Sequence, residues 1–194
     1  MTDQRLRPKL DPMVRENAAR SGKAARPAFA QIFSESFDYV WFSLRRLGVR
    51  ERDVEDLTHE VFLRIHGQLD RYDPERPLRP WLFAFAYRVA SDYRKLARHR
   101  LESLEASPEA TDASVSAFDV LATREASNLA QAALGELDVE RRAIFLLHEV
   151  DGCTMPEIAD ALQIPLNTAY SRLRLAREQL ARALVRLRSR RGDR

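Results

Sequence analysis

Several classes of protein are excluded by what the sequence lacks. It holds a single cysteine, Cys153, so no intramolecular disulfide and no metal site built on thiolates is possible. No apolar run approaches the roughly 20 residues that span a bilayer. The first residues carry charges but no apolar segment of the signal-peptide type, so we expect a cytoplasmic protein. Strand-like alternation of apolar and polar residues is missing as well, which predicts an all-α fold.

The patterns that carry enzyme chemistry are also missing. The sequence has no Gly-rich phosphate loop and no paired carboxylates with a histidine. The closest approach to a zinc motif is His59 and His66, but a zinc helix of the H-E-x-x-H type needs a second histidine where Leu63 stands. We therefore expect no catalytic residue, no metal site and no cofactor.

Charge is distributed unevenly along the chain. The formal net charge is only +3, but Thr168–Arg194 contains nine arginines against Glu178 and Asp193. Leu101–Val120 has five acidic residues and no lysine or arginine. Such segregation indicates a polyanionic partner at particular faces of the protein.

The stretch Thr154–Arg177 has the pattern of a helix-turn-helix. Thr154 and Glu157 have the spacing of a capping box, and Pro156 falls in the first turn, where its missing N–H is harmless. The period breaks at Gln163-Ile164-Pro165 and restarts at helical spacing from Leu166. We interpret Leu166–Arg177 as the recognition helix.

The polar face of this second helix carries short hydrogen-bonding side chains followed by guanidinium groups, which are the groups that read base edges in a major groove. They are Asn167, Thr168, Ser171, Arg172 and Arg174. An ordinary two-helix corner with a solvated face is the alternative. Because acidic residues are absent from Leu166 to Arg177, we favour the DNA-reading interpretation.

Two helices are predicted near the N-terminus. Apolar and aromatic residues from Phe29 to Leu47 follow a helical period, and Gly48 is a plausible stop. A second helix is expected from an N-cap at Asp53 to Gly67. Its remaining face is acidic at the start and includes Phe62. That face is either simply solvated or a docking surface for another protein, and spacing alone does not separate the two.

A third helix is predicted over Pro80–Arg100, with a buried stripe that includes Phe85, Val89 and Leu96. Aromatic and cationic residues share the face left off that stripe: Phe83, Tyr87, Arg88, Ser91, Arg94, Lys95 and Arg98. Such a face suits unpaired bases, which stack on rings while arginines meet phosphates. The alternative is that Phe83 and Tyr87 pack in the core from another side.

The chain therefore divides into two helical domains joined by a flexible acidic linker. The segments are a mobile basic arm (1–26), a first domain (27–100), the linker (101–123), a helix-turn-helix domain (124–188) and a basic tail (189–194). In the second domain, Asp138 is expected to cap a helix that ends at Asp151-Gly152.

Three stretches, in this order, resemble bacterial extracytoplasmic-function sigma factors. They are DVEDLTHEVFLRIH (Asp53–His66), PWLFAFAYRVASDYRK (Pro80–Lys95) and ALGELDVERRAIFLLHEVDGCTMPEIADALQIPLNTAYSRLRLAR (Ala133–Arg177). The resemblance covers about Phe29–Arg98 and Ala122–Leu187. A helix-turn-helix alone is common, but the three motifs together are specific.

The resemblance implies a factor that binds RNA polymerase core, reads the −35 and −10 promoter elements and aids melting. The clamp helices of the largest polymerase subunit would be gripped by Asp53, Glu55, Asp56, Leu57, Glu60, Val61 and Phe62. Trp81–Lys95 would open and read the −10 element. Thr168, Ser171, Arg172 and Arg177 would serve the −35 element, where we also place Asn167, Tyr170 and Arg174. An anti-sigma factor is the further partner implied.

The sequence departs from the family pattern in places. His59 stands where glutamine is usual, Arg88 where asparagine is common, and Tyr170 where lysine or arginine is usual. Gln163 replaces the turn glycine and Pro165 the usual serine. These departures affect the promoter sequence expected, not the class. The rival is a helix-turn-helix regulator of the response-regulator type, whose receiver domain needs strands that the first half of the chain lacks.

The length of the linker predicts a closed resting state. Fully extended, the linker reaches about 75 Å, but as a flexible coil it spans only about 25–30 Å. The resemblance places the two promoter elements on the order of two helical turns apart, about 70 Å. We therefore expect the free protein to be compact, with its DNA-reading faces partly covered, and the polymerase to stretch it.

Overall fold

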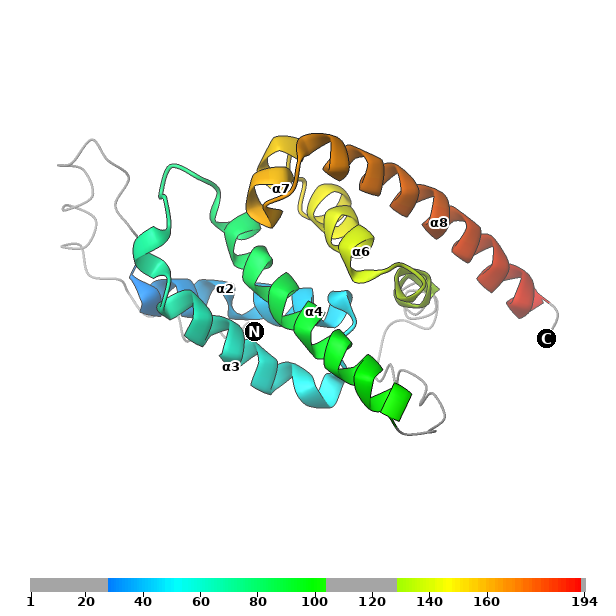
Figure 1. The fold of residues 1–194 in the computed structure, drawn as a ribbon, viewed down its shortest axis with the longest axis horizontal. Coiled ribbons are helices and arrows are strands. Elements are labelled where there is room, and N and C mark those ends of the chain that lie inside the picture. Colours follow the sequence, from blue (N-terminus) through cyan, green and yellow to red (C-terminus); the bar gives the residue numbers. More distant parts are fainter. Residues whose placement is uncertain (1–27, 104–128, 193–194) are drawn as a thin grey trace, which may run out of the picture.

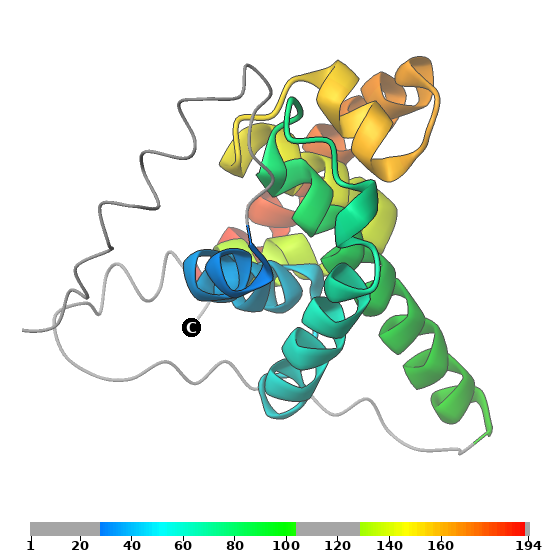
Figure 2. The same cartoon turned by 90° about the vertical axis from the view of Figure 1, so that its left-hand side faces the viewer.

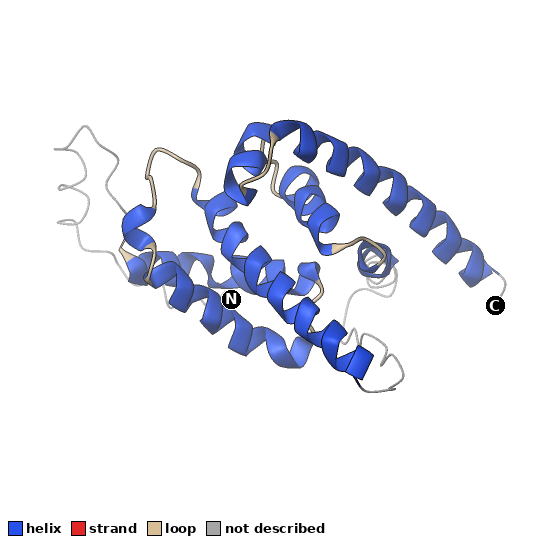
Figure 3. Cartoon of the chain, in the orientation of Figure 1, coloured by secondary structure: helices blue, strands red, loops and turns tan. Residues whose placement is uncertain are grey.

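The computed structural model describes residues 28–103 and 129–192, except for the side chains of residues 98–103 and 190–192. Within these ranges the regular structure is helical and no strand is present (Figure 3), which confirms the all-α prediction. The N-terminal arm and nearly all of the acidic linker lie outside the described residues. The first residues assigned to the linker instead extend helix α4, which ends at Ser103.

The N-terminal half consists of α2 (Phe29–Leu47), α3 (Glu51–His66), the short η1 (Leu69–Arg71) and α4 (Leu78–Ser103). Gly48 ends α2 in a left-handed conformation (φ 97°), as predicted. The start predicted for α3 is wrong, because the helix begins at Glu51 after Arg50. The Asp53 carboxylate does not cap the helix and accepts a 2.6 Å hydrogen bond from the Tyr93 hydroxyl, which ties α3 to α4.

The C-terminal half has helical residues 129–135, then α6 (Val139–Phe145), the π-helical η2 (Leu146–Val150), α7 (Met155–Leu162) and α8 (Leu166–Gly192). Asp138 caps α6 by accepting from the Arg141 amide at 2.8 Å. The predicted capping box forms, with the Thr154 amide donating to Glu157 at 2.7 Å. Sequence spacing placed both caps correctly.

Helix α4 lies at the centre of the molecule, with α2 and α3 on one side and α6 and α7 on the other (Figures 1 and 2). Its buried residues therefore face two ways, and one apolar cluster runs from α2 and α3 through α4 into α6, α7 and α8. Val40, Leu82 and Ile158, one from each region, are all fully buried. The two halves of the chain thus pack against each other.

The extent of two apolar stripes differs from the prediction. Leu96 was expected in the buried stripe of α4 but is 55% exposed, because α4 runs on past the helices that cover it (Figure 1). Leu166, at the start of α8, is 41% exposed. None of the helices in the described ranges combines the length and apolar character that crossing a bilayer requires.

Candidate nucleic-acid and polymerase interfaces

Helices α7 and α8 form the helix-turn-helix, and small residues allow them to cross closely. Ala159 of α7 and Ala169 of α8 are both buried. The turn between the helices depends on Gln163, which has a left-handed conformation (φ 56°) without being glycine. Its amide donates to Asp160 O at 3.2 Å, and its side chain donates to the same carbonyl at 2.6 Å. These bonds offset part of the cost of that conformation.

The predicted recognition residues lie along one exposed side of α8 and its flanks. Asn167, Tyr170, Ser171, Arg174 and Arg177 are exposed, and Thr168 and Arg172 are partly buried. The hydroxyl of Ser171 donates to the Asn167 carbonyl at 2.9 Å and is therefore already engaged with the helix backbone. An open hollow beside this side is lined by His148, Met155, Tyr170, Arg174 and Arg177, among others.

Three of the predicted recognition residues on α8 are arginines paired with carboxylates of the same domain. Arg172 pairs with Glu140 of α6, and Arg177 donates to Glu149 of η2 at 2.8 Å. Arg174 pairs with Glu178 at 2.7 Å along α8 itself. A guanidinium group held by a carboxylate must exchange that partner before it can bind a phosphate or a base. Periodicity gave no sign of the pairs with Glu140 and Glu149, because these partners lie on other helices.

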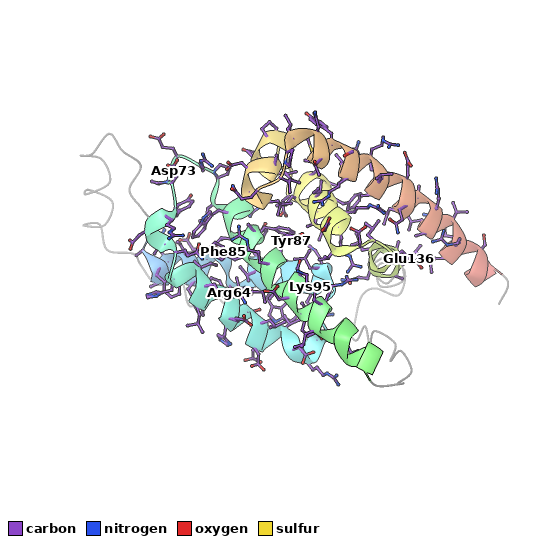
Figure 4. All side chains as sticks on the ribbon, viewed as in Figure 1. Arg64, Asp73, Phe85, Tyr87, Lys95 and Glu136 are labelled. Carbon is purple, nitrogen blue, oxygen red and sulfur yellow. The ribbon has the colours of Figure 1, made fainter. Side chains whose placement is uncertain are left out.

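The face proposed for α4 is only partly exposed. Phe83 is 1% exposed and lies in the core, so its placement on an open aromatic face was wrong. The reason is that α4 packs on helices from both sides and buries a second stripe. Tyr87 is half-buried (labelled in Figure 4). Of the other predicted residues, Arg88 and Lys95 are exposed, Ser91 and Arg94 are partly buried, and the Arg98 side chain lies outside the described set.

Tyr87 lies within electrostatic range of the ion pair between α6 and α8. Burial and the charge of Glu140 raise the pKa of its phenol, whereas Arg172 acts in the opposite direction. Glu140 and Arg172 form the ion pair between α6 and α8, so the charges of that pair reach Tyr87, a residue assigned to the −10 surface.

The acidic face of α3 is open by comparison. Glu55 and Asp56 are exposed, and Asp53, Leu57 and Glu60 are partly buried. Val61 and Phe62, however, are 0% and 2% exposed, so their assignment to the docking surface was wrong. Phe62 is part of an aromatic core, with its ring 4.8 Å from that of Phe33 and stacked 6.1 Å from that of Phe37.

A residue of this face that sequence reasoning missed is Leu63. It is 74% exposed and lies one helical turn after His59, which is exposed as well. The sequence did contain a signal for Leu63, because it is an apolar residue that falls outside the buried stripe predicted for α3. In the sequence, Leu63 served only to reject a zinc motif, which needs a histidine at that position.

Two family models match the chain, Sigma-70 region 2 over residues 33–100 and Sigma-70, region 4 over residues 127–180. The sigma factor NccH of Alcaligenes xylosoxydans xylosoxydans is 30% identical over 180 residues, which are 90% of this chain and 96% of NccH. The ECF sigma factor SigE of Mycolicibacterium smegmatis is 32% identical over 169 residues, covering 84% of this chain and 63% of SigE.

The chain belongs to the extracytoplasmic-function sigma factors. As a sigma factor it binds RNA polymerase core and promoter DNA and directs promoter-specific transcription, which disfavours the rival regulator. The solved structure of CnrH in complex with the cytosolic domain of CnrY is 26% identical in sequence, with a TM-score of 0.54. The structural match spans 89% of this sigma factor and 94% of the CnrH chain.

Proposed function

We propose that α3 is the surface by which this sigma factor docks on polymerase. The open face of α3 carries the proposal, because Glu55, Asp56 and Leu63 are all exposed to solvent on one helix. The acidic groups favour a basic partner surface. The family resemblance indicates that this partner surface is formed by the clamp helices of the largest polymerase subunit. Asp53, Leu57 and Glu60 lie at the edge of this face.

We propose further that the halves divide the promoter between them. Residues 27–100 dock on core and read the −10 element through α4, and residues 124–188 read the −35 element through α8. The family matches over 33–100 and 127–180 support these bounds. On α4 we assign contact with melted DNA to the exposed Arg88 and Lys95 and to the half-buried Tyr87. The linker predicted over residues 101–123 begins inside α4, which runs to Ser103, and the rest of that prediction lies outside the described residues.

Two further parts of the proposal rest on the family. We infer that the sigma factor acts in the cytoplasm, where polymerase is. We also infer that a protein of the anti-sigma class holds it inactive, a partnership supported by CnrH, which was solved bound to the cytosolic domain of CnrY. Such a partner would act on a chain whose halves already pack together.

The test is transcription in vitro with purified polymerase core and no other sigma factor. Start sites mapped after overproduction supply the candidate promoters. We expect the protein and core alone to initiate at those promoters. A requirement for a second sigma factor at every promoter tested would contradict the proposal and favour an accessory regulator.

A further inference from the structure

Two polar contacts join the halves of the sigma factor beside α4. The Tyr39 hydroxyl of α2 donates to the Asp151 carboxylate, at the end of η2, at 2.6 Å. Arg76, in the connector that precedes α4, pairs with Asp160 of α7. The first contact is partly buried and the second is exposed to solvent. Both carboxylates belong to the C-terminal half and both of their partners to the N-terminal half.

The surroundings of Tyr39 show that its contact is part of a packed interface. The Arg79 guanidinium lies over the Tyr39 ring, 5.5 Å from its centre. Burial and the Asp151 carboxylate raise the pKa of Tyr39 far above its usual value, so the hydroxyl remains a donor at neutral pH. Arg79 belongs to the first turn of α4, so this contact reaches the start of the helix assigned to the −10 element.

A buried arginine fills the opposite end of the interface. Arg142 of α6 is 3% exposed and donates to the Gly135 and Leu137 carbonyls at 2.9 and 3.0 Å. Its guanidinium lies against Gly48 of the N-terminal half, where an added Cβ would be 2.5 Å from Nη1. Burial and the nearby charge of Arg94 lower the pKa of Arg142 to about 10. Two like charges meet there, which is unfavourable for closure.

We propose that Asp151 and Asp160 form a carboxylate latch that holds the C-terminal half over the connector and first turn of α4 and keeps DNA from that surface. This inference rests on the proposed function in one respect, the assignment of the −10 element to α4. The Arg76 side chain is 59% exposed, and in the closed state the Asp160 carboxylate occupies the place on its guanidinium that a phosphate would take. The latch is therefore a competitor of DNA.

The strength of the contacts suits a reversible latch. A partly buried neutral-to-charged hydrogen bond is a modest contact, and a solvent-exposed ion pair is weaker still. The like charges of Arg94 and Arg142 work against closure. Opening then needs only the differential binding that a partner such as polymerase core supplies.

The test removes both contacts with little change in shape, in the double variant Tyr39→Phe/Asp160→Ala. Neither residue belongs to the proposed polymerase or DNA surfaces. Glu136→Ala is the matched control, because Glu136 (labelled in Figure 4) pairs with Arg186 inside the C-terminal half. Amide hydrogen exchange of residues 72–79 reports closure. A fluorescein-labelled single strand carrying the mapped −10 element, added without core, reports access to α4.

In the double variant we expect faster exchange over residues 72–79 and DNA binding tighter by about three- to tenfold, the range for one or two modest contacts. The control should match the wild type in both. Unchanged exchange would show that the carboxylates do not hold the halves together. Faster exchange without tighter binding would show that the latch does not block DNA. Failure of the proposed function is a different result, namely no promoter-specific transcript from the wild type with core.

Discussion

The two kinds of surface in this sigma factor differ in how accessible they are. On α3, Glu55, Asp56 and Leu63 face solvent. On α8, by contrast, Arg172 and Arg177 are held by carboxylates of other helices. The surface proposed for polymerase is open, whereas two of the arginines proposed for the −35 element are engaged with the protein's own carboxylates.

This difference indicates an order of events. Because the proposed polymerase surface is open and arginines proposed for DNA are held by carboxylates, we expect the protein to meet the enzyme first and the promoter afterwards. We expect core binding to favour an arrangement in which the halves separate, because only differential affinity for the open state shifts the equilibrium. Free sigma factor would have little tendency to occupy promoters on its own.

The largest effect is expected from reversing charge on the open surface. Asp56→Arg should weaken core binding at least about a hundredfold, since like charges brought together at an interface cost several kcal/mol. Helical content should be unchanged, because Asp56 is exposed. The measurement is co-purification with core, with Glu136→Arg as a control on the other half. Wild-type recovery of core with Asp56→Arg would remove α3 from the docking role.

A second test separates the two aromatic residues of α4. Phe83→Ala should lower the free energy of unfolding by about 3–5 kcal/mol, because the ring is buried. Tyr87→Ala should instead leave a folded protein that transcribes poorly from duplex promoters and better from pre-melted ones. Loss of the Tyr87 ring should weaken the interaction with melted DNA by about 1–3 kcal/mol, the value of one base–aromatic stack.

Thermal unfolding and transcription from both templates measure the difference between Phe83 and Tyr87. An equal loss of stability in the two variants would assign Tyr87 to the core and leave α4 without an aromatic reader. An unperturbed melting curve for Phe83→Ala would contradict the packing described for α4.

The position of Phe83 also shows how far sequence reasoning reached. Helical periodicity located α2, α4 and the helix-turn-helix, and capping chemistry located Thr154 and Asp138, because both signals are local. Periodicity relative to a single buried face cannot reveal that α4 is covered from two sides. That depends on α6 and α7, which come later in the chain.

For the candidate site, too, some residues were predicted from the sequence and others were not. The residue types on α3 and α8 were predicted from the sequence and from a family resemblance. Val61 and Phe62 were misplaced because motif positions do not distinguish the residues that touch a partner from those that support the helix. The pairing of Arg172 with Glu140 joins separate helices and was therefore beyond any local pattern.

A smaller effect tests the recognition helix. Arg172→Ala should weaken binding of holoenzyme to a matched −35 element by about 1–3 kcal/mol, the range for a lost bidentate base contact. Binding of holoenzyme to scrambled −35 sequences should weaken much less. Equal losses on matched and scrambled DNA would make Arg172 a phosphate contact, and the assignment of base reading would have to move along α8.

The smallest effect concerns a carboxylate that competes with DNA. Glu149→Gln releases Arg177, which Glu149 holds at 2.8 Å. Binding of the sigma factor to duplex DNA should become tighter by at most about 1 kcal/mol, as expected for an exposed pair. Fluorescence anisotropy over a range of salt concentrations measures this gain, which should shrink as salt rises. Weaker binding by Glu149→Gln would show that Glu149 positions Arg177 for DNA and does not compete with it.

The most direct test of the account is the shape of the wild-type protein without polymerase, measured by small-angle scattering together with its binding to a duplex carrying both promoter elements. We predict one compact particle, with the halves packed through α4, that binds the duplex poorly until core is added. A dumbbell with separated domains that binds the two-element duplex tightly without core would contradict the account.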